Sequence, residues 1–435
     1  MIQQHPQGLA SDPPPPPEGT PPTRRGPLAP PTNRRLGPRT LPLHLGWLAT
    51  TWATSSLALA SWNAGSLTWK PALGPRAAAW IEAAAAVDRD RLLTAVEHAG
   101  RARLGRFMAG VLAYRRHPYR RTVGDVPVLW RQGATQLLVF GDDLAVTAPV
   151  LLLVPSLINR AYVLDLSERR SFCRWLASQG VRVLLVDWGT PTDVELGFNL
   201  ADVVCGPLEG ALDAALDAYG GPIGVGGYCM GGLLALGLAS RRARDIAHTV
   251  MLATPYDFHA DAEQACRLQA AVPFLLPWID RIGFLPTDGL QALFAGLDPS
   301  LVITKFVALS RLAADSATAE AFVALEDWIN DGVPLAGPVA RTCLAEWYGA
   351  NAVARGGWRI AGRPVRAAAL GHIPSLVMVP EGDRIVPPAS AKALAAAWPG
   401  AQLMPIPLGH IGMITSARAR TQVWQPVANW CHARA

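Results

Sequence analysis

Six short, nearly continuous apolar runs constrain the fold of this chain more than any other feature of its sequence. Runs of strand length that are apolar throughout are typical of strands buried on both faces of a mainly parallel sheet. They span residues 150–154, 181–186, 223–225, 249–252, 376–379 and 403–406. Helical patterns lie between them, at 167–179, 207–219, 233–240 and 389–397. This alternation predicts a doubly wound α/β fold with helices on both faces of the sheet.

One long interval interrupts the alternation. Residues 256–355 contain no convincing buried strand, and helical patterns rich in Phe, Leu, Trp and Ala follow one another. Such an interval is too long to be a loop between two strands. We therefore expect a helical cap that covers the active site and excludes water, with Trp278, Trp328 and Trp347 in its core. The sheet-forming core then consists of residues 126–255, which begin with a predicted hairpin, and residues 356–435.

The first 125 residues lie outside this pattern. Residues 1–41 are rich in Pro and Arg and poor in large apolar residues, which predicts a disordered tail. Residues 42–125 are predicted to be helical. Within them, the nearly uncharged stretch 43–69 is long enough to suggest a membrane span, but many Ser, Thr and Asn residues dilute it. We expect instead a helix that docks on protein or on a hydrophobic surface.

Charge and cysteine content exclude several functions. The formal net charge is +6, but no long Lys/Arg block is interleaved with aromatic residues, so nucleic acid is not an expected partner. The six cysteines show no C-x-x-C or Cys/His metal spacing, so no metal site is expected and the thiols are predicted to be reduced. The N-terminus is polar and Pro-rich instead of basic and then apolar, which predicts no secretory signal and a cytoplasmic location.

A tight turn, Gly227-Tyr228-Cys229-Met230-Gly231-Gly232, joins the run at 223–225 to the helical pattern at 233–240. Strand, turn and helix with a cysteine at the apex match the nucleophile elbow of an α/β-hydrolase fold, with Cys in the usual place of Ser. A dinucleotide fingerprint would need Gly at position 229, and a phosphate loop would need Lys-Ser/Thr after Gly231. Both of these alternatives fail, which leaves a catalytic Cys229 or a buried structural one.

Cys229 would need a base, because a thiol is mostly protonated at neutral pH. In this fold an acid and then a histidine follow later strands. His410 directly follows the run at 403–406, and Asp383 lies in the loop after the run at 376–379. Glu381 competes for the role of the acid, and an ion pair with Arg384 would make Asp383 merely structural. The oxyanion hole would consist of the Met230 amide and an amide near Ser156 and Leu157, after the run at 150–154.

Several motifs together resemble those of polyhydroxyalkanoate synthases. The segment 154–166 (VPSLINRAYVLDL), the segment 187–191 (DWGTP), the elbow, the segment 382–387 (GDRIVP) and the segment 409–411 (GHI) carry this resemblance. In the predicted cap, 326–331 (EDWIND) and 348–351 (YGAN) are similar to the shorter, two-subunit, class III-like synthases. The resemblance covers roughly residues 115–416 and leaves out the first hundred or so residues.

The resemblance implies a mechanism. His410 takes the proton of Cys229, whose thiolate attacks the thioester of a 3-hydroxyacyl-CoA, expels CoA and holds the acyl group. Asp383 is implied to activate the 3-hydroxyl group of the incoming unit. No cofactor is implied, since the CoA thioester is the substrate. Arg384 stands where the family usually has His, and a cation beside Asp383 would weaken that carboxylate as a base.

Other functions fit the same scaffold. A thioesterase or an intracellular polyester depolymerase would use water as the acceptor, and a granule-associated protein would carry a vestigial site. The complete set of Cys229, Asp383 and His410 in fold order argues against the vestigial site. For the synthase, the resemblance implies a homodimer, an accessory synthase subunit and the surface of a polyester granule as partners. No transmembrane span is expected.

Overall fold

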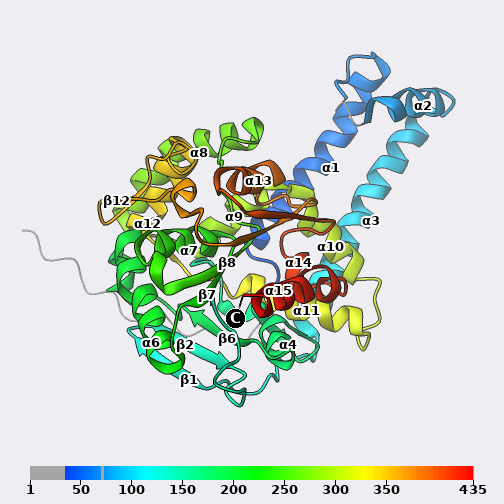
Figure 1. The fold of residues 1–435 in the computed structure, drawn as a ribbon. Coiled ribbons are helices and arrows are strands. Elements are labelled where there is room, and N and C mark those ends of the chain that lie inside the picture. Colours follow the sequence, from blue (N-terminus) through cyan, green and yellow to red (C-terminus); the bar gives the residue numbers. More distant parts are fainter. Residues whose placement is uncertain (1–34, 70–72, 435) are drawn as a thin grey trace, which may run out of the picture. The chain divides into compact units, whose positions relative to one another are not determined.

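A computed structural model describes residues 35–69 and 73–434 of the chain, and these belong to one compact unit, Pro31–Ala435. Its centre is an eight-stranded sheet with the order β1-β2-β6-β3-β7-β8-β13-β14 (Figure 1). Strand β2 pairs antiparallel with both β1 and β6, whereas all neighbouring strands from β6 to β14 in this order pair in parallel. The strands are β1 (Val128–Gln132), β2 (Thr135–Phe140), β3 (Val150–Val154), β6 (Arg182–Asp187), β7 (Ile223–Tyr228), β8 (Ile246–Leu252), β13 (Ser375–Pro380) and β14 (Gln402–Ile406). All six predicted runs are strands of this sheet, which has the α/β-hydrolase fold.

Helices cover both faces of the sheet, as predicted. One apolar core contains Leu212, Leu234 and Leu394, and the other contains Phe172 and Val427. The helices of the first are α5 (Leu200–Val203), α6 (Glu209–Tyr219), α7 (Met230–Arg241) and α13 (Pro388–Ala397); those of the second are α4 (Phe172–Ser178), α14 (Gly412–Thr415) and α15 (Gln425–His432).

Three local predictions differ from the structure. The helix expected at 167–179 begins only at Phe172, because residues before it form a small hairpin of β4 (Asp165–Ser167) and β5 (Arg170–Ser171). The helix expected from Pro207 instead begins at Leu200 and accommodates the proline in a π-helical turn, Val204–Leu208, because proline has no N–H to donate. Strand β14 lies at the sheet edge with Leu403 exposed, so burial on both faces was the wrong prediction for this run.

The interval between β8 and β13 is a largely helical cap. Its elements are α8 (Ala262–Ile282), β9 (Phe284–Leu285), α9 (Thr287–Leu297), α10 (Pro299–Leu309), α11 (Ala317–Asn330), β10 (Leu335–Ala336), α12 (Gly337–Arg341) and η6 (Thr342–Gly349). Trp328 and Trp347 are buried in it, as predicted. Trp278 is 43% exposed, so its predicted place in the cap core is wrong: it lies on the outer side of α8.

The N-terminal helices are α1 (Leu41–Asn63), α2 (Gly74–Ala85) and α3 (Arg89–Arg116), and two of them, α1 and α3, pack on this cap. Phe107 and Tyr114 of α3 pack edge-on against Phe306 of α10, and Leu48 of α1 joins the same buried cluster. The expected docking helix thus rests on protein, although it ends at Asn63 and not at residue 69.

Part of the predicted tail is ordered. Arg35 donates to the Asp327 carboxylate at 2.6 and 2.7 Å and to the carbonyls of His117 and Tyr119, both at 2.6 Å. The predicted boundary at residue 41 is therefore too late, because this guanidinium ties the segment to the cap. Residues 1–34, which make up the rest of the predicted tail, lie outside the described residues.

No single helix within residues 35–69 or 73–434 has both the length and the apolar composition needed to cross a bilayer. Helices α9 and α10 would meet those criteria only as a pair, and they are bent by 93°.

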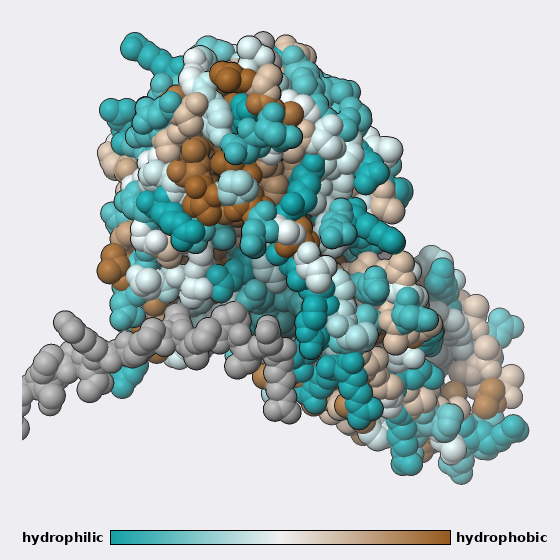
Figure 2. All heavy atoms as spheres, turned by 90° about the horizontal axis from the view of Figure 1, so that it is seen from below, coloured by the Kyte–Doolittle hydropathy of each residue, from teal (hydrophilic) through white to brown (hydrophobic). Residues whose placement is uncertain are grey.

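Large apolar side chains that remain exposed include Leu57, Val146, Val194 and Phe274. Figure 2 shows that hydrophobic residues gather in one area of the face in view, within a largely hydrophilic surface.

Candidate active site

Cys229 occupies the sharp turn between β7 and α7. Its backbone has φ 55° and ψ −125°, a conformation that costs free energy for a residue other than glycine. The turn is held by the Cys229 N–H, which donates to the Leu252 carbonyl at 2.9 Å. A Cβ atom at Gly227 would lie 2.4 Å from the Gly232 Cα. The flanking glycines are therefore needed because the turn brings two backbone segments into contact.

His410 and Asp383 meet beside Cys229. They follow β14 and β13, which are neighbouring strands, and the His410 Nδ1 lies 2.6 Å from the Asp383 Oδ2. The other oxygen, Oδ1, accepts hydrogen bonds from the amides of Ile385 at 2.8 Å and Val386 at 2.9 Å. The Asp383 side chain is fully buried. Since Nδ1 is used by Asp383, Nε2 of His410 remains for the Cys229 sulfur, with which the ring shares a hydrogen bond.

The charge state of His410 depends on its two neighbours. Burial opposes a charge on the ring, but Cys229 and Asp383 outweigh burial and raise the pKa of His410 to about 10. An opposite charge close to a histidine stabilises its protonated form. The arrangement therefore favours the protonated ring that His410 becomes once it has taken a proton from the neighbouring thiol.

The loop after β3 lies against the elbow. Val154 of β3 is paired with Gly227 of β7, and a Cβ atom at Gly231 would lie 2.0 Å from the Val154 carbonyl oxygen. Ser156 lines the cavity beside Cys229, whereas Leu157 packs against the apolar core. Met230 begins α7, whose first amides carry the positive end of the helix dipole. The predicted oxyanion hole thus has its two segments in contact, and the role of each amide stays a prediction.

Two residues whose roles could not be foreseen hold this site in place. The Tyr228 hydroxyl donates to the His410 carbonyl at 3.1 Å, and the two rings lie 5.3 Å apart. The Trp188 Nε1 donates to the Pro155 carbonyl at 3.0 Å, which fixes the loop after β3. Both residues belong to motifs of the predicted family resemblance, but residue type alone does not reveal these hydrogen bonds.

Arg384 does not pair with Asp383. Its guanidinium forms an ion pair with Asp298 of the cap, and its side chain is 73% exposed. Asp383 is buried, whereas Arg384 beside it is exposed, so the two side chains face in different directions. The ion pair with Arg384 that would make Asp383 merely structural is therefore not formed, and Arg384 instead connects the loop of the acid to the start of α10.

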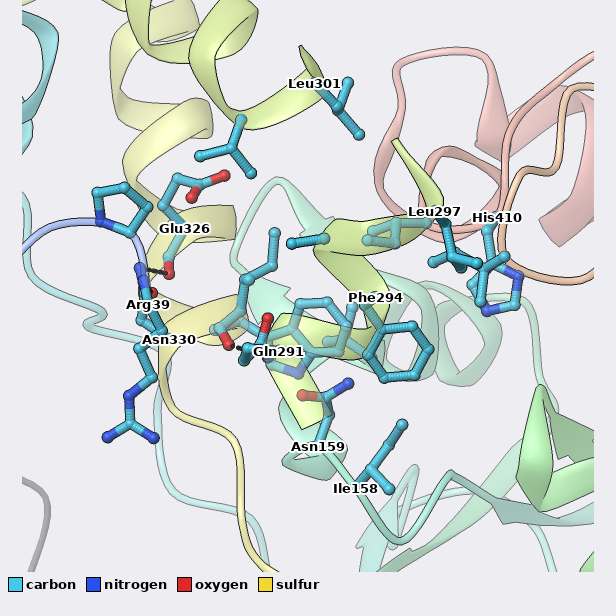
Figure 3. A pocket seen from close by; sticks show the side chains of 18 of the residues that line it. Arg39, Ile158, Asn159, Gln291, Phe294, Leu297, Leu301, Glu326, Asn330 and His410 are labelled. Atoms are coloured by element: carbon cyan, nitrogen blue, oxygen red, sulfur yellow. Dashed lines mark hydrogen bonds between the residues drawn. The ribbon is translucent and has the colours of Figure 1, made fainter. Parts of the chain in front are cut away.

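A cavity of about 170 Å³ opens over Cys229 and His410. Figure 3 shows Phe294 and Leu297 of α9 and Leu301 of α10 around it, so the cap forms its roof. Trp328 also lines this cavity, although it was expected to lie only in the cap core. Apolar walls of this kind exclude water from the reacting atoms.

Other histidines that follow Cys229 in the sequence lie away from it. His259 contacts the Tyr348 carbonyl at 2.8 Å and His432 contacts the Gln179 carbonyl at 2.8 Å, while His248 is buried in β8. Glu381, the competing acid, is exposed. Across the described part of the chain, no group of three or more His, Cys, Asp or Glu side chains is arranged to hold a metal ion.

The order of the sheet, the strained elbow and the helical cap define a protein of the α/β-hydrolase class. Solved structures similar to the chain include a monoacylglycerol lipase from Paleococcus ferrophilus, which is 14% identical with a TM-score of 0.43 over 69% of this chain and 99% of the lipase. A scan against protein-family profiles gave no match.

Curated sequences allow a closer assignment. A poly(3-hydroxyalkanoate) polymerase subunit PhaC from Synechocystis sp. is 30% identical over 293 residues, 65% of this chain and 77% of that protein. The subunit from Thiocystis violacea is 29% identical, over 65% of this chain and 81% of its own length. The subunit from Haloferax mediterranei is 29% identical, over 71% of this chain and 64% of its own length. The chain belongs to the poly(3-hydroxyalkanoate) polymerase family, and these relatives support synthase function, with no better support for the hydrolase alternative.

Proposed function

We propose that this protein polymerises short-chain 3-hydroxyacyl-CoA by carrying the growing acyl chain as a thioester on Cys229. The observation that supports this most strongly is the contact of His410 with both Cys229 and Asp383 at the floor of a cavity roofed by the cap. No cofactor enters the proposal, because the CoA thioester is itself the activated substrate.

In the acylation step, Nε2 of His410 takes the thiol proton of Cys229. The thiolate attacks the substrate carbonyl, and the resulting oxyanion is stabilised by the Met230 amide and by an amide of the loop around Ser156 and Leu157. The bond between the carbonyl carbon and the CoA sulfur then breaks, and the imidazolium returns its proton to the departing CoA thiolate. One thioester replaces another, so the acyl group remains reactive.

In the elongation step, the hydroxyl group of an incoming 3-hydroxyacyl-CoA attacks the acyl group on Cys229. The alcohol loses its proton to His410, the bond to the Cys229 sulfur breaks, and the proton returns to that sulfur. The family resemblance implies that Asp383 deprotonates the alcohol directly. We propose instead that Asp383 acts through His410, because its buried oxygens are already engaged by the imidazole and by two amides.

The partners proposed for this protein are inferred from its family and not from the geometry of the active site. The relatives are named as polymerase subunits, and we propose that this chain likewise acts as a homodimer with an accessory synthase subunit. We also propose a cytoplasmic protein at the surface of polyester granules. On α1, Leu57 is 74% exposed, and such an apolar side chain suits contact with an apolar polymer.

The test is the product formed from 3-hydroxybutyryl-CoA by the full chain, with CoA release followed in parallel. We expect polyester from the wild-type protein and neither polyester nor CoA release from Cys229→Ala. Free 3-hydroxybutyrate as the sole product would overturn the proposal in favour of a hydrolase.

A further inference from the structure

Helices α1 and α3 begin at the cap and run to an end that packs on little else. Arg39 and His44, at the start of α1, line the active-site cavity, and both helices pack on α10 near it. Figure 1 shows α2 at the far end of the two helices. Among the described residues between 64 and 106, only Ala77 is buried. Residues 52–106, called the arm below, therefore present most of their side chains to a partner.

The arm has ordered contacts of its own. Trp52 of α1 lies against α3, where a Cβ atom at Gly100 would be 2.4 Å from the Trp52 Cδ1. At the far end, the ring centroids of Trp62 and Trp69 are 5.3 Å apart, and those of Trp69 and Trp80 are 5.8 Å apart. These contacts join both long helices and α2, so the arm offers a defined surface.

The far end of the arm is apolar on its outside. Large apolar side chains are exposed there on and beside α2: Leu73, Trp80, Ile81 and Val87. Exposed apolar residues that gather in one place mark interaction surfaces. Tryptophan in particular is enriched where a membrane meets water, because its ring is apolar and its N–H is polar.

Helix α3 adds a strongly basic side. It contains seven arginines and only two acidic residues. At 3.6 residues per turn, three of the arginines lie on the side of α3 opposite Phe107, which packs on α10. All three are exposed: Arg91, Arg101 and Arg106. Among the described residues, only Arg101 of these three is within 4 Å of a carboxylate, that of Glu97 at 3.9 Å. This side of the helix is therefore free to bind anions.

The two features together select one kind of partner. A neutral polyester would contact the apolar end but would gain nothing from the arginines. A nucleic acid would attract the arginines but would leave the apolar end in water. A phospholipid surface with anionic headgroups satisfies both, because phosphates attract guanidinium groups and the interfacial layer accepts apolar side chains.

We propose that the arm docks on an anionic phospholipid surface, with the arginines of α3 on the headgroups and the apolar end inserted among them. The contact is interfacial, since no single helix of residues 35–69 or 73–434 meets the criteria for a membrane span. This inference goes beyond the reaction proposed at Cys229 and does not depend on it.

Flotation of the full chain with vesicles tests the charge term. We expect the wild-type protein to bind vesicles of phosphatidylcholine and phosphatidylglycerol at least tenfold more tightly than vesicles of phosphatidylcholine alone. Each arginine near an anionic surface strengthens binding about fivefold, so the triple variant Arg91→Gln, Arg101→Gln and Arg106→Gln should bind the anionic vesicles about 100-fold more weakly. Raising the salt from 0.1 M to 1 M should weaken wild-type binding, because the screening length falls from about 10 Å to about 3 Å.

A second variant tests the apolar term. Ile81→Ser combined with Val87→Ser removes two exposed apolar side chains from the arm. It should bind the anionic vesicles about tenfold or more weakly, because the burial of such side chains in the interface is lost. The matched control is Val194→Ser combined with Phe274→Ser, which changes two exposed apolar residues outside the arm and should bind like the wild type.

The charge control removes three exposed arginines outside the arm, Arg131→Gln, Arg169→Gln and Arg355→Gln, and should also bind like the wild type. CoA release from 3-hydroxybutyryl-CoA should stay at the wild-type rate in all these variants, which shows that they are folded. Equal binding of neutral and anionic vesicles, or an equal loss in the arm and control triples, would overturn the proposal. Binding to polyester particles that depends on the arm, without binding to vesicles, would overturn it in favour of the polymer.

Discussion

Asp383 and Glu381 lie two residues apart in one loop, yet their surroundings differ completely. Asp383 is buried against the His410 imidazole and two amides, whereas Glu381 is exposed. A buried carboxylate that accepts from Nδ1 fixes the tautomer and the orientation of the ring and stabilises the imidazolium. This difference in burial assigns the role of the acid to Asp383. Asp383 acts by orienting the His410 ring and stabilising its protonated form.

We expect Asp383→Asn to slow the first release of CoA from 3-hydroxybutyryl-CoA by about 10²-fold or more, because the amide no longer holds His410 in the productive tautomer. Rapid-quench measurement of CoA in a single turnover checks this. Glu381→Gln is the control and should release CoA at the wild-type rate. A normal first release from Asp383→Asn, followed by failed turnover, would show that Asp383 acts only on the incoming alcohol.

Helix α3 supports the cap through an unusually close approach to α10. A Cβ atom at Gly110 would lie 1.9 Å from the Phe306 carbonyl oxygen, whereas one at Gly105 on the same helix would have no atom within 4 Å. Only glycine permits the first contact. Helices α1 and α3 are thus fitted to the cap that roofs the cavity, and their packing bears on the site without touching Cys229.

Gly110→Ala should destabilise the protein by about 1–3 kcal/mol, since the added methyl group forces α3 and α10 apart. Gly105→Ala, which adds the same methyl group in open space, should stabilise it by about 0.5–1 kcal/mol. Urea unfolding of both variants measures the two free energies. Equal effects of the two substitutions would show that α3 does not pack on α10 in this way.

His248 makes the stability of the whole protein depend on pH. It is 2% exposed, neither ring nitrogen has a partner among the described residues, and burial, aided by the charge of Arg434, lowers the pKa of His248 to about 4. The unfolded chain has an ordinary histidine with a pKa of about 6.5. Between these values only the unfolded chain takes up the proton, so the free energy of unfolding falls as the pH falls from about 6.5 to about 4.

At pH 5 this histidine alone should cost about 2 kcal/mol of stability relative to pH 7. His248→Leu removes the titrating group, so its loss of stability over the same interval should be smaller by that amount. Urea unfolding of both proteins at the two pH values gives the comparison. An identical pH dependence of wild-type protein and variant would contradict the burial of an uncharged His248.

Much of the molecule could be predicted from local patterns. The apolar runs predict the strands. Cys229, Asp383 and His410 each follow one of these strands, and the carboxyl ends of parallel strands meet at one edge of the sheet, so their meeting could be predicted. The partner of Arg384 and the hydrogen bond of Tyr228 depend on side-chain directions that spacing does not encode. His44 and Arg39 enter the cavity only because α1 docks on the cap, which is a contact between distant parts of the chain.

The central claim is that Cys229 carries the acyl chain and passes it to an alcohol and not to water. Butyryl-CoA tests this most directly, because its acyl group has no hydroxyl to accept the chain. We predict that the protein releases one CoA per active site and then stops, with a butyryl group on the peptide that contains Cys229, as measured by mass spectrometry. Continuous release of CoA together with free butyrate, or a peptide without the adduct, would contradict the account.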